Sequence, residues 1–253
     1  MLKHRVIPCL LLRNTGLVKT RRFKNPKYVG DPINAIRIFN EKEVDELMVL
    51  DILASKKSIE PNFSLIAQFA GECFMPLCYG GGVRTVEQAK QLFALGVEKI
   101  CIQSAAIERP AFISELAERF GSQSVVVSID IKRNIFNKAH LFESKSGRTL
   151  SSGWLDYVRE SVRRGAGEIV LNSVDRDGEM NGYDLQMIRD TVATVTVPVI
   201  ALGGAGRLEH FRQAVDVGAA AVSAGSMFVF QGPHRAVLIS YPAYPELERL
   251  FES

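Results

Sequence analysis

Residues 76–82 read Pro-Leu-Cys-Tyr-Gly-Gly-Gly, and residues 198–204 read Pro-Val-Ile-Ala-Leu-Gly-Gly. In both stretches a short apolar run, which is typical of a buried β-strand, ends in consecutive glycines. The two stretches are 122 residues apart, and the same spacing relates other identical residues. The pairs are Glu46 and Glu168, Pro76 and Pro198, Gly81 and Gly203, Gly82 and Gly204, Gly96 and Gly218, and Ser104 and Ser226. Two or three such matches could arise by chance, but six at one spacing favour a duplicated half.

Apolar runs rich in β-branched residues recur along the whole chain, and most precede a segment with helical periodicity. The predicted strands are 6–12, 46–52, 75–79, 99–103, 124–131, 168–172, 197–202 and 220–224. The predicted helices, which carry apolar residues three and four positions apart, are 31–40, 63–72, 85–95, 109–120, 154–164, 184–194, 209–217 and one that begins at Tyr244. The chain therefore alternates between strand and helix eight times.

The predicted strands are apolar at nearly every position, as parallel strands are when helices cover the sheet. Eight strand–helix units in 253 residues fit one (β/α)8 TIM barrel. No linker rich in Pro, Gly or Ser divides the chain into two domains. We therefore predict an α/β fold with a single domain, residues 1–253, built from two duplicated half-barrels.

The composition is that of a globular protein, with 47% hydrophobic residues and 31 Lys plus Arg against 28 Asp plus Glu. The resulting charge of +3 is too small to indicate nucleic-acid binding, and no apolar run approaches the ~20 residues that span a bilayer. Cys9, Cys73, Cys78 and Cys101 form no CxxC pair, and the apolar stretch 6–12 lacks a signal-peptide cleavage site. These features favour reduced, buried thiols and a cytoplasmic location.

Two glycine-rich loops are the strongest candidates for ligand binding. Gly80-Gly81-Gly82 follows the third strand, and Gly203-Gly204-Ala205-Gly206 follows the seventh. One strand later come Gln103-Ser104-Ala105 and Ala224-Gly225-Ser226. Because glycine lets backbone N–H groups approach an anion, and loops after barrel strands bind phosphate, the pattern predicts two phosphate cradles on opposite sides of one barrel mouth. A ligand with a phosphate at each end would fit. The alternative is that the glycines only permit tight turns.

The segment 13–28, between the first strand and its helix, carries six cationic side chains. Loops longer than a dozen residues in compact barrels are usually lids, so we expect a lid that attracts an anionic substrate. A solvated loop without contacts is the alternative. Nucleic acid is disfavoured because the basic residues have little aromatic interleaving.

Carboxylates at the ends of barrel strands can act as general acids or bases. Asp51 ends the second strand, Asp130 lies near the end of the fifth, and Asp175 and Asp177 follow the sixth. Each could instead cap a helix or join an ion pair. The histidines, His4, His140, His210 and His234, form no HxH or HxxxH pair, so no metal site is expected.

Residues 49–55, 80–82, 126–130, 172–178 and 201–206 resemble the cyclase subunit of imidazole glycerol phosphate synthase, and the similarity covers essentially the whole chain. In that family, ammonia made by a glutaminase partner enters the bottom of the barrel. At the top it reacts with a bisphosphorylated aminoimidazole-carboxamide ribonucleotide, giving imidazole glycerol phosphate and aminoimidazole carboxamide ribotide. The resemblance implies a class I glutamine amidotransferase partner, a phosphorylated small-molecule substrate and no cofactor.

The resemblance also assigns residues. It implies phosphate binding at Gly82, Ser104, Gly178, Gly204, Gly225 and Ser226, and a loop lysine at Lys19. Together with Asp51, Gly81, Asp177 and Gly203, from the strand ends and glycine loops, these are the predicted substrate- or phosphate-binding residues. It implies an ammonia gate at the bottom of the barrel, a ring formed by Arg5, Glu46, Lys99 and Glu168. Such a ring can stay shut as an ion network and open when one side chain swings aside. The alternative for the ring is a purely structural plug.

One departure from the family changes the expected function. The family uses two aspartates as acid and base; Asp130 matches the second, but the first position holds Leu11. Thr20 stands where the family has glycine, and Leu202 replaces a small polar residue. The gate residues match the family while the catalytic position 11 does not. This combination resembles a divergent branch of the family that supplies ammonia for sugar amidation in surface-polysaccharide biosynthesis. The stretch 24–34 also resembles that branch.

Three functions therefore remain open. The first, which we favour, is ammonia transfer for amidation of a sugar, in which a third, sugar-amidating protein could take part. The second is an active cyclase of histidine biosynthesis. The third is a non-catalytic scaffold that activates the glutaminase and conducts ammonia to another protein.

Overall fold

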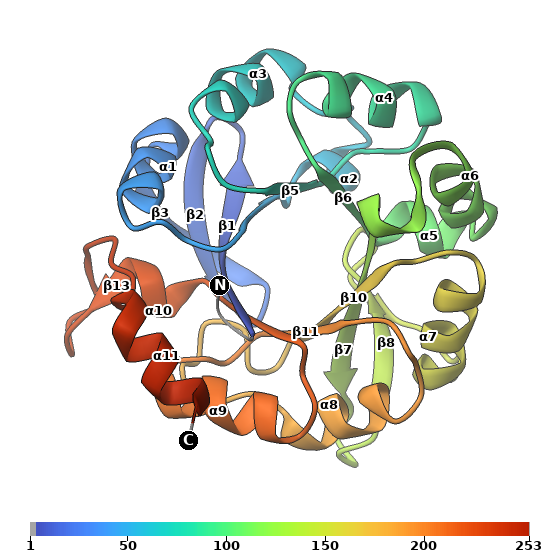
Figure 1. Ribbon diagram of the computed structural model, residues 1–253. Coiled ribbons are helices and arrows are strands. Elements are labelled where there is room, and N and C mark those ends of the chain that lie inside the picture. Colours follow the sequence, from blue (N-terminus) through green and yellow to red (C-terminus); the bar gives the residue numbers. More distant parts are fainter. Residues whose placement is uncertain (1–3, 253) are drawn as a thin grey trace.

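Eight parallel strands form a closed barrel in the computed structural model, which describes residues 4–252 (Figure 1). Around the barrel these are β1 (Arg5–Arg13), β4 (Leu47–Asp51), β5 (Leu77–Gly80), β6 (Lys99–Ile102), β7 (Val125–Arg133), β10 (Glu168–Ser173), β11 (Val199–Leu202) and β12 (Ala221–Ala224). The sheet closes because β12 pairs with β1 in parallel, with Arg5 opposite Ala221 and Pro8 opposite Ala224. The predicted single (β/α)8 barrel is therefore confirmed; residues 1–3 and 253 of the predicted domain lie outside the described residues.

Helices surround the strands as an outer ring (Figure 1). The predicted helices are present as α1 (Pro32–Glu41), α3 (Phe63–Gly71), α4 (Val86–Ala94), α6 (Ala111–Phe120), α7 (Trp154–Arg163), α8 (Leu185–Val192), α9 (Leu208–Asp216) and α11 (Tyr244–Glu252). Side-chain caps explain several starts: Asp31 and Asp184 accept N–H bonds from the first turns of α1 and α8, and Thr85 forms a capping box with Gln88. Shorter helices are α2 (Ala54–Lys57), α5 (Ser104–Glu108), η1 (Ser122–Ser124) and α10 (Ser226–Val229).

The buried residues form two layers. Phe39, Phe69 and Phe112 belong to the layer between helices and strands, where each is 0% exposed. The lumen of the barrel is a separate apolar cluster, made of Ile7, Cys9, Met48, Cys78, Cys101, Val126, Val170, Ile200, Leu202 and Ala221. Three of the four cysteines are thus buried free thiols in the lumen, while Cys73 is partly exposed. The lumen is a packed core rather than an open pore.

The internal repeat is visible in the element boundaries. A shift of 122 residues superimposes the bounds of β5 on β11, of β6 on β12 and of α4 on α9 without a difference of one residue. Equivalent residues therefore occupy equivalent places in the two halves. The predicted half-barrel duplication is a feature of the fold as well as of the sequence.

The segment 13–28 corrects one expectation, because it is not an irregular loop. Gly16–Arg21 forms β2 and Lys24–Gly30 forms β3, and this hairpin continues the sheet beyond β1, with Leu11 opposite Val18. The hairpin forms because Leu17 and Val18 pack into the core while the peptide groups of β1 beyond the barrel need partners.

A second extension was not predicted. β7 continues past the barrel and pairs with β8 (Ala139–Glu143), which pairs with β9 (Arg148–Thr149). A small hairpin, β13 (Phe230–Gln231) and β14 (Ala236–Val237), follows α10. Among the described residues, no helix has both the length and the apolar character needed to cross a membrane.

Candidate functional site

The common direction of the eight strands gives the barrel two different ends. We call the end at the carboxyl termini of the strands the mouth and the other the ring end. One cavity occupies the mouth. Asp130 and eleven substrate- or phosphate-binding residues were predicted at this end of the barrel. Those that line it, with Asp130, are Lys19, Asp51, Gly81, Ser104, Asp177, Gly178, Gly203, Gly204, Gly225 and Ser226. Gly82 is not among the residues that line the cavity, and a Cβ on it would lie 2.8 Å from the Ile59 carbonyl oxygen.

The glycine loop 203–206 has the features of an anion cradle. The N–H groups of Gly204 and Ala205 have no hydrogen-bond partner within residues 4–252. Gly204 has a φ of +118°, and a Cβ there would clash with the Gly182 carbonyl oxygen. A side chain at this position is excluded, and the backbone lines the cavity instead.

Lys19 lies next to Gly225 in the same cavity. Its Nζ donates to the Cys9 carbonyl oxygen and lies 2.5 Å from the position that a Cβ on Gly225 would take. The side chain is buried, and burial lowers the pKa of Lys19. A cation of low solvation at this place would attract a phosphate group.

Asp130 is a buried carboxylate that three polar side chains contact in the mouth. Ser144 donates to it through a short hydrogen bond, and Asn172 Nδ2 and Ser128 Oγ each lie 3.3 Å from Asp130 Oδ1. Asp130 is 4% exposed, and burial raises its pKa to about 6, although the three hydrogen bonds act in the opposite direction. A carboxyl group with this pKa can exchange a proton near neutral pH.

The other mouth aspartates are engaged by the backbone or by the hairpin. Asp51 Oδ1 accepts from the N–H groups of Leu53 and Ala54 at 2.8 and 3.1 Å. Asp177 Oδ2 accepts from Thr20 Oγ1 at 2.6 Å and from the Phe23 N–H at 3.0 Å. Asp177 thus fastens the β2–β3 hairpin over the mouth.

Further contacts hold the hairpin in the same place. Arg21 and Arg22 pair with Glu179 at 2.6 and 3.0 Å. The ring of Phe23 meets that of Phe142 in an edge-on contact, with centroids 5.9 Å apart. The hairpin and the β7–β9 extension therefore cover the mouth from two sides.

Leucine side chains line part of the mouth. Leu11, Leu50 and Leu202 line the cavity with Cys9 and Cys101. No proton can be transferred from the side chain of Leu11. The apolar surroundings also agree with the raised pKa of Asp130, since poor solvation disfavours its ionised form.

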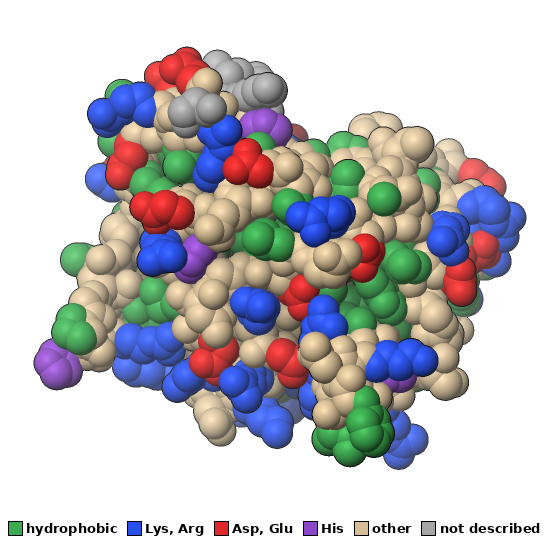
Figure 2. Space-filling model, turned by 90° about the horizontal axis from the view of Figure 1, so that it is seen from below, with side chains coloured by type: hydrophobic (Ala, Val, Ile, Leu, Met, Phe, Trp, Pro, Cys, Tyr) green, Lys and Arg blue, Asp and Glu red, His purple; other side chains and the backbone are tan. Residues whose placement is uncertain are grey.

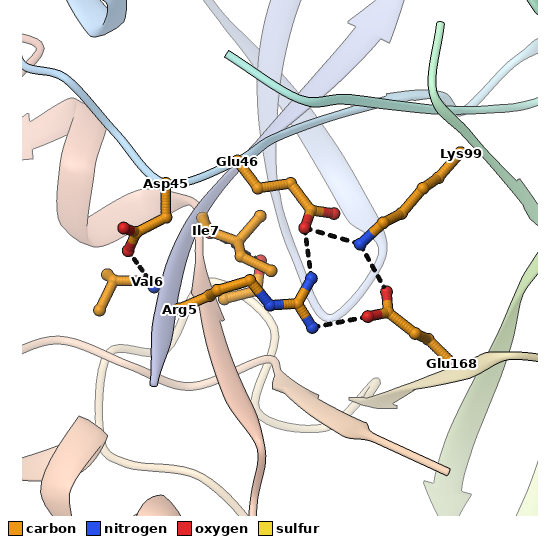
Figure 3. A network of polar contacts seen from close by, with 8 residues as sticks. Arg5, Val6, Ile7, Asp45, Glu46, Lys99 and Glu168 are labelled. Atoms are coloured by element: carbon orange, nitrogen blue, oxygen red, sulfur yellow. Dashed lines mark hydrogen bonds and ion pairs between the residues drawn. The ribbon is translucent and has the colours of Figure 1, made fainter. Parts of the chain in front are cut away.

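The four predicted gate residues meet at the ring end, where Figure 3 shows their charged groups directed toward one another. Arg5 donates to Glu46 through a short bond and to Glu168 at 2.6 Å. Lys99 Nζ lies 2.8 Å from Glu46 and 2.9 Å from Glu168. Each cation bridges both carboxylates, so the four side chains form one closed ion network at the ring end. Glu46 Oε1 is buried and has no hydrogen-bond partner among the described residues.

Positive charge is concentrated around the mouth. Segments 13–30 and 132–153 carry eleven Lys and Arg residues and one acidic residue, Glu143. In the side view of Figure 2, Lys and Arg side chains gather along the lower edge of the molecule, which is the mouth end. This charge would attract an anionic ligand.

Two of the histidines make separate polar contacts. His210 Nδ1 accepts the Gly206 N–H at 3.1 Å, and His140 Nε2 lies 3.2 Å from Asn134 Nδ2. In the part of the chain that the structure describes, no three His, Cys, Asp or Glu side chains are grouped as metal ligands.

Sequence reasoning missed three polar residues of the mouth. Asn172 ends a predicted strand. It could have been selected, as Asp130 was, as a polar side chain at the end of a barrel strand. Ser128 lies two residues before Asp130, on the same face of β7, and could have been found by strand alternation. Ser144 follows β8, which was not predicted, so no sequence signal placed it beside Asp130.

Comparison with known proteins gives a consistent result. Residues 5–234 match the family described as "Histidine biosynthesis protein". The chain is 52% identical over 249 residues to a provisionally named imidazole glycerol phosphate synthase subunit, hisF2, of Pseudomonas aeruginosa, covering 98% of this chain and 99% of that protein. It is 50% identical over 257 residues to a similarly named HisF of Leptospira borgpetersenii, covering 99% and 100%. It is 42% identical over 226 residues to imidazole glycerol phosphate synthase subunit HisF of Streptomyces avermitilis, covering 89% and 90%.

Thr20→Ala should loosen the hairpin, because it removes a hydrogen bond to a carboxylate, worth about 1.5–3 kcal/mol. We expect trypsin to cleave after Arg21, Arg22 or Lys24 at least ~10-fold faster than in the wild type. Thr194→Ala, which removes a hydroxyl bond to the Asp190 carbonyl oxygen far from the mouth, is the matched control. Equal cleavage rates in wild type and Thr20→Ala would show that this bond does not hold the hairpin.

Asp130→Asn should change how stability depends on pH. Because the pKa of Asp130 is raised to about 6, the folded protein holds this proton more tightly than the unfolded chain. The wild type should therefore lose stability relative to Asp130→Asn as the pH rises from about 4 to about 6, on the order of 3 kcal/mol in total. Urea unfolding of both proteins at matched pH values measures this difference, and parallel profiles would contradict it.

Proposed function

Because the chain belongs to the histidine biosynthesis protein family, as a relative of the imidazole glycerol phosphate synthase cyclase subunit, we propose that it receives ammonia from a glutaminase docked on its ring end. The ammonia serves the amidation of a phosphorylated or nucleotide-linked sugar rather than ring closure of an imidazole. A third, sugar-amidating protein completes this reaction if the mouth does not carry it out alone. The relatives' names give them as subunits, which supports a partner.

The observation that carries the proposal is the side chain at position 11. Leu11 lines the mouth cavity where the family resemblance implies an acid or base. Asp177, which lines the same cavity, is engaged through Oδ2 by two hydrogen bonds to the hairpin. One proton-transfer partner, Asp130, remains, and loss of the other costs about 10²–10⁴-fold in rate.

The ring end supports the ammonia-receiving half of the proposal. Each of its two cations pairs with both carboxylates, and Glu46 Oε1, which has no hydrogen-bond partner among residues 4–252, can accept from an N–H group. Above the ring, the lumen is lined by apolar side chains such as Ile7, Val126 and Val170. Neutral ammonia can cross such a layer when side chains move, whereas desolvation opposes ammonium.

The residues of the mouth support the part of the proposal that the acceptor substrate is an anion. The cradle 203–206, Lys19 and the basic hairpin segments place free N–H groups and positive charge around one cavity. The first cradle contributes Gly81 and Ser104 on the same cavity. Diphosphate-linked sugars and bisphosphates both satisfy this chemistry.

A second candidate is the cyclase reaction of histidine biosynthesis. The observation in its favour is Asp130, whose pKa of about 6 suits a group that both accepts and donates a proton at neutral pH. The similarity to the HisF subunit of Streptomyces avermitilis points in the same direction.

The partner is tested by co-expression with the class I glutaminase encoded nearest to this gene, followed by size-exclusion chromatography. We expect a 1:1 complex. Phe74, which precedes β5 at the ring end and is 86% exposed, should contribute to the interface, so Phe74→Asp should weaken the complex at least ~10-fold. Phe136→Asp, at the mouth end and 83% exposed, is the matched control and should leave binding unchanged. Failure to co-elute at micromolar concentration would count heavily against the proposal.

The reaction is tested with ammonia and the bisphosphorylated substrate of the histidine-pathway cyclase. The wild-type chain should turn it over at least ~10²-fold more slowly than a true cyclase, because Leu11 cannot transfer a proton. Binding of this substrate without turnover would support a changed acceptor. Turnover at an ordinary enzymatic rate, about 1–10³ s⁻¹, would overturn sugar amidation in favour of the cyclase.

A further inference from the structure

The loop of the second cradle is held from behind by a histidine. Gly206 is the last residue of the loop 203–206, and its N–H donates to His210 Nδ1 at 3.1 Å. His210 is the third residue of α9 and is 6% exposed. It does not line the mouth cavity, so it acts on a ligand only through the loop.

The loop has little freedom to move on its other side. The Gly182 N–H donates to the Gly204 carbonyl oxygen at 2.8 Å, and Arg176 Nη1 donates to the Gly182 carbonyl oxygen at 3.0 Å. A Cβ on Gly206 would clash with the Met180 carbonyl oxygen. The loop is therefore clamped between segment 180–182 and His210, and this clamp orients the free N–H groups of Gly204 and Ala205.

The duplicated half contains the same contact with a different acceptor. A shift of 122 residues relates Gly206 to Arg84 and His210 to Gln88. The Arg84 N–H donates to Gln88 Oε1 at 2.8 Å, and Gln88 is the third residue of α4. Both cradle loops are thus tied to the first turn of the following helix, one through an amide and the other through an imidazole.

We propose that His210 is a positioning residue that makes the second cradle sensitive to pH, whereas Gln88 supports the first cradle without this sensitivity. Only a neutral imidazole with its proton on Nε2 can accept at Nδ1. When Nδ1 is protonated, two donors face each other across the Gly206 contact, so this hydrogen bond is lost and the clamp on that side is released. This inference rests on the proposed phosphate binding, and it adds pH control at one end of the ligand.

The groups around His210 determine in which direction its pKa is shifted. Burial and the nearby cations Arg207 and Arg176 lower its pKa, while Glu209 acts in the opposite sense. Glu209 is itself 3.6 Å from Arg207, which limits its effect. Because its pKa lies below the ordinary value, His210 is neutral near pH 7. The second cradle therefore loosens only at a pH lower than the one at which an ordinary histidine becomes protonated.

The test is a titration with inorganic phosphate, followed by ¹H–¹⁵N NMR of the full chain between about pH 5 and about pH 7.5, a range that spans histidine titration. Amide signals of Gly204 and Gly206 report the second cradle, and those of Gly81 and Arg84 report the first in the same sample. In the wild type, phosphate affinity of the second cradle should fall about 3- to 10-fold more on acidification than that of the first, as expected for loss of one hydrogen bond. The first cradle corrects for the protonation of phosphate itself.

Two reciprocal substitutions isolate the role of His210. His210→Gln should give the second cradle the pH profile of the first while preserving phosphate binding at pH 7.5. Gln88→His should make the first cradle acid-sensitive, and this gain remains informative if His210→Gln fails to fold. A merely structural histidine would change stability in His210→Gln without changing the difference between the two pH profiles.

The outcomes separate this inference from the proposed function. Parallel pH profiles of the two cradles in the wild type, or an Nδ1–H tautomer of His210 at pH 7.5, would overturn the positioning role while leaving phosphate binding intact. If neither cradle responds to phosphate, the proposed ligand chemistry fails instead. The role of His210 is then decided by the Gly206 amide signal. In the wild type its chemical shift must follow the titration of His210, and in His210→Gln it must not change with pH over the same range.

Discussion

The parallel pairing of β12 with β1 is the contact on which the remaining features depend. Closure of the sheet forces all eight strands to end in one rim, so the polar groups that follow them converge on one cavity. The same closure brings Arg5, Glu46, Lys99 and Glu168 together at the other rim, although they are distant in sequence. Between the rims lies an apolar lumen, which separates two polar sites chemically while leaving them on a common axis.

Much of this arrangement could be predicted from the sequence. The helical periodicity located all eight long helices, because each buries one face against the barrel. The 122-residue repeat located both glycine loops, since a duplicated fold places equivalent turns at equivalent points of the rim. Whether the mouth residues bind phosphate, and whether the ring gates ammonia, are predictions about ligands that the fold makes possible but does not by itself decide.

The parts that sequence reasoning missed depend on contacts outside the repeating unit. The hairpin of β2 and β3 carries many exposed cations, a composition that suggested a loop; it forms a sheet because it pairs with the free end of β1 and is fastened by Asp177. Ser144 reaches Asp130 only because the β7–β8 extension folds back over the mouth. Neither pairing is encoded by local periodicity.

The basic β2–β3 hairpin and the basic β7–β9 extension have a kinetic consequence that is separate from the contacts inside the cavity. Eleven cationic residues against one acidic residue in segments 13–30 and 132–153 create a positive field that extends into solvent over about one Debye length, roughly 8 Å at physiological ionic strength. Such fields increase the encounter rate of anions by about 10- to 10³-fold, and salt suppresses them steeply. For the proposed anionic ligand, these two basic segments would therefore act on the association rate constant, whereas the buried N–H groups and Lys19 would act on the residence time, so ionic strength would separate capture of the ligand from its retention.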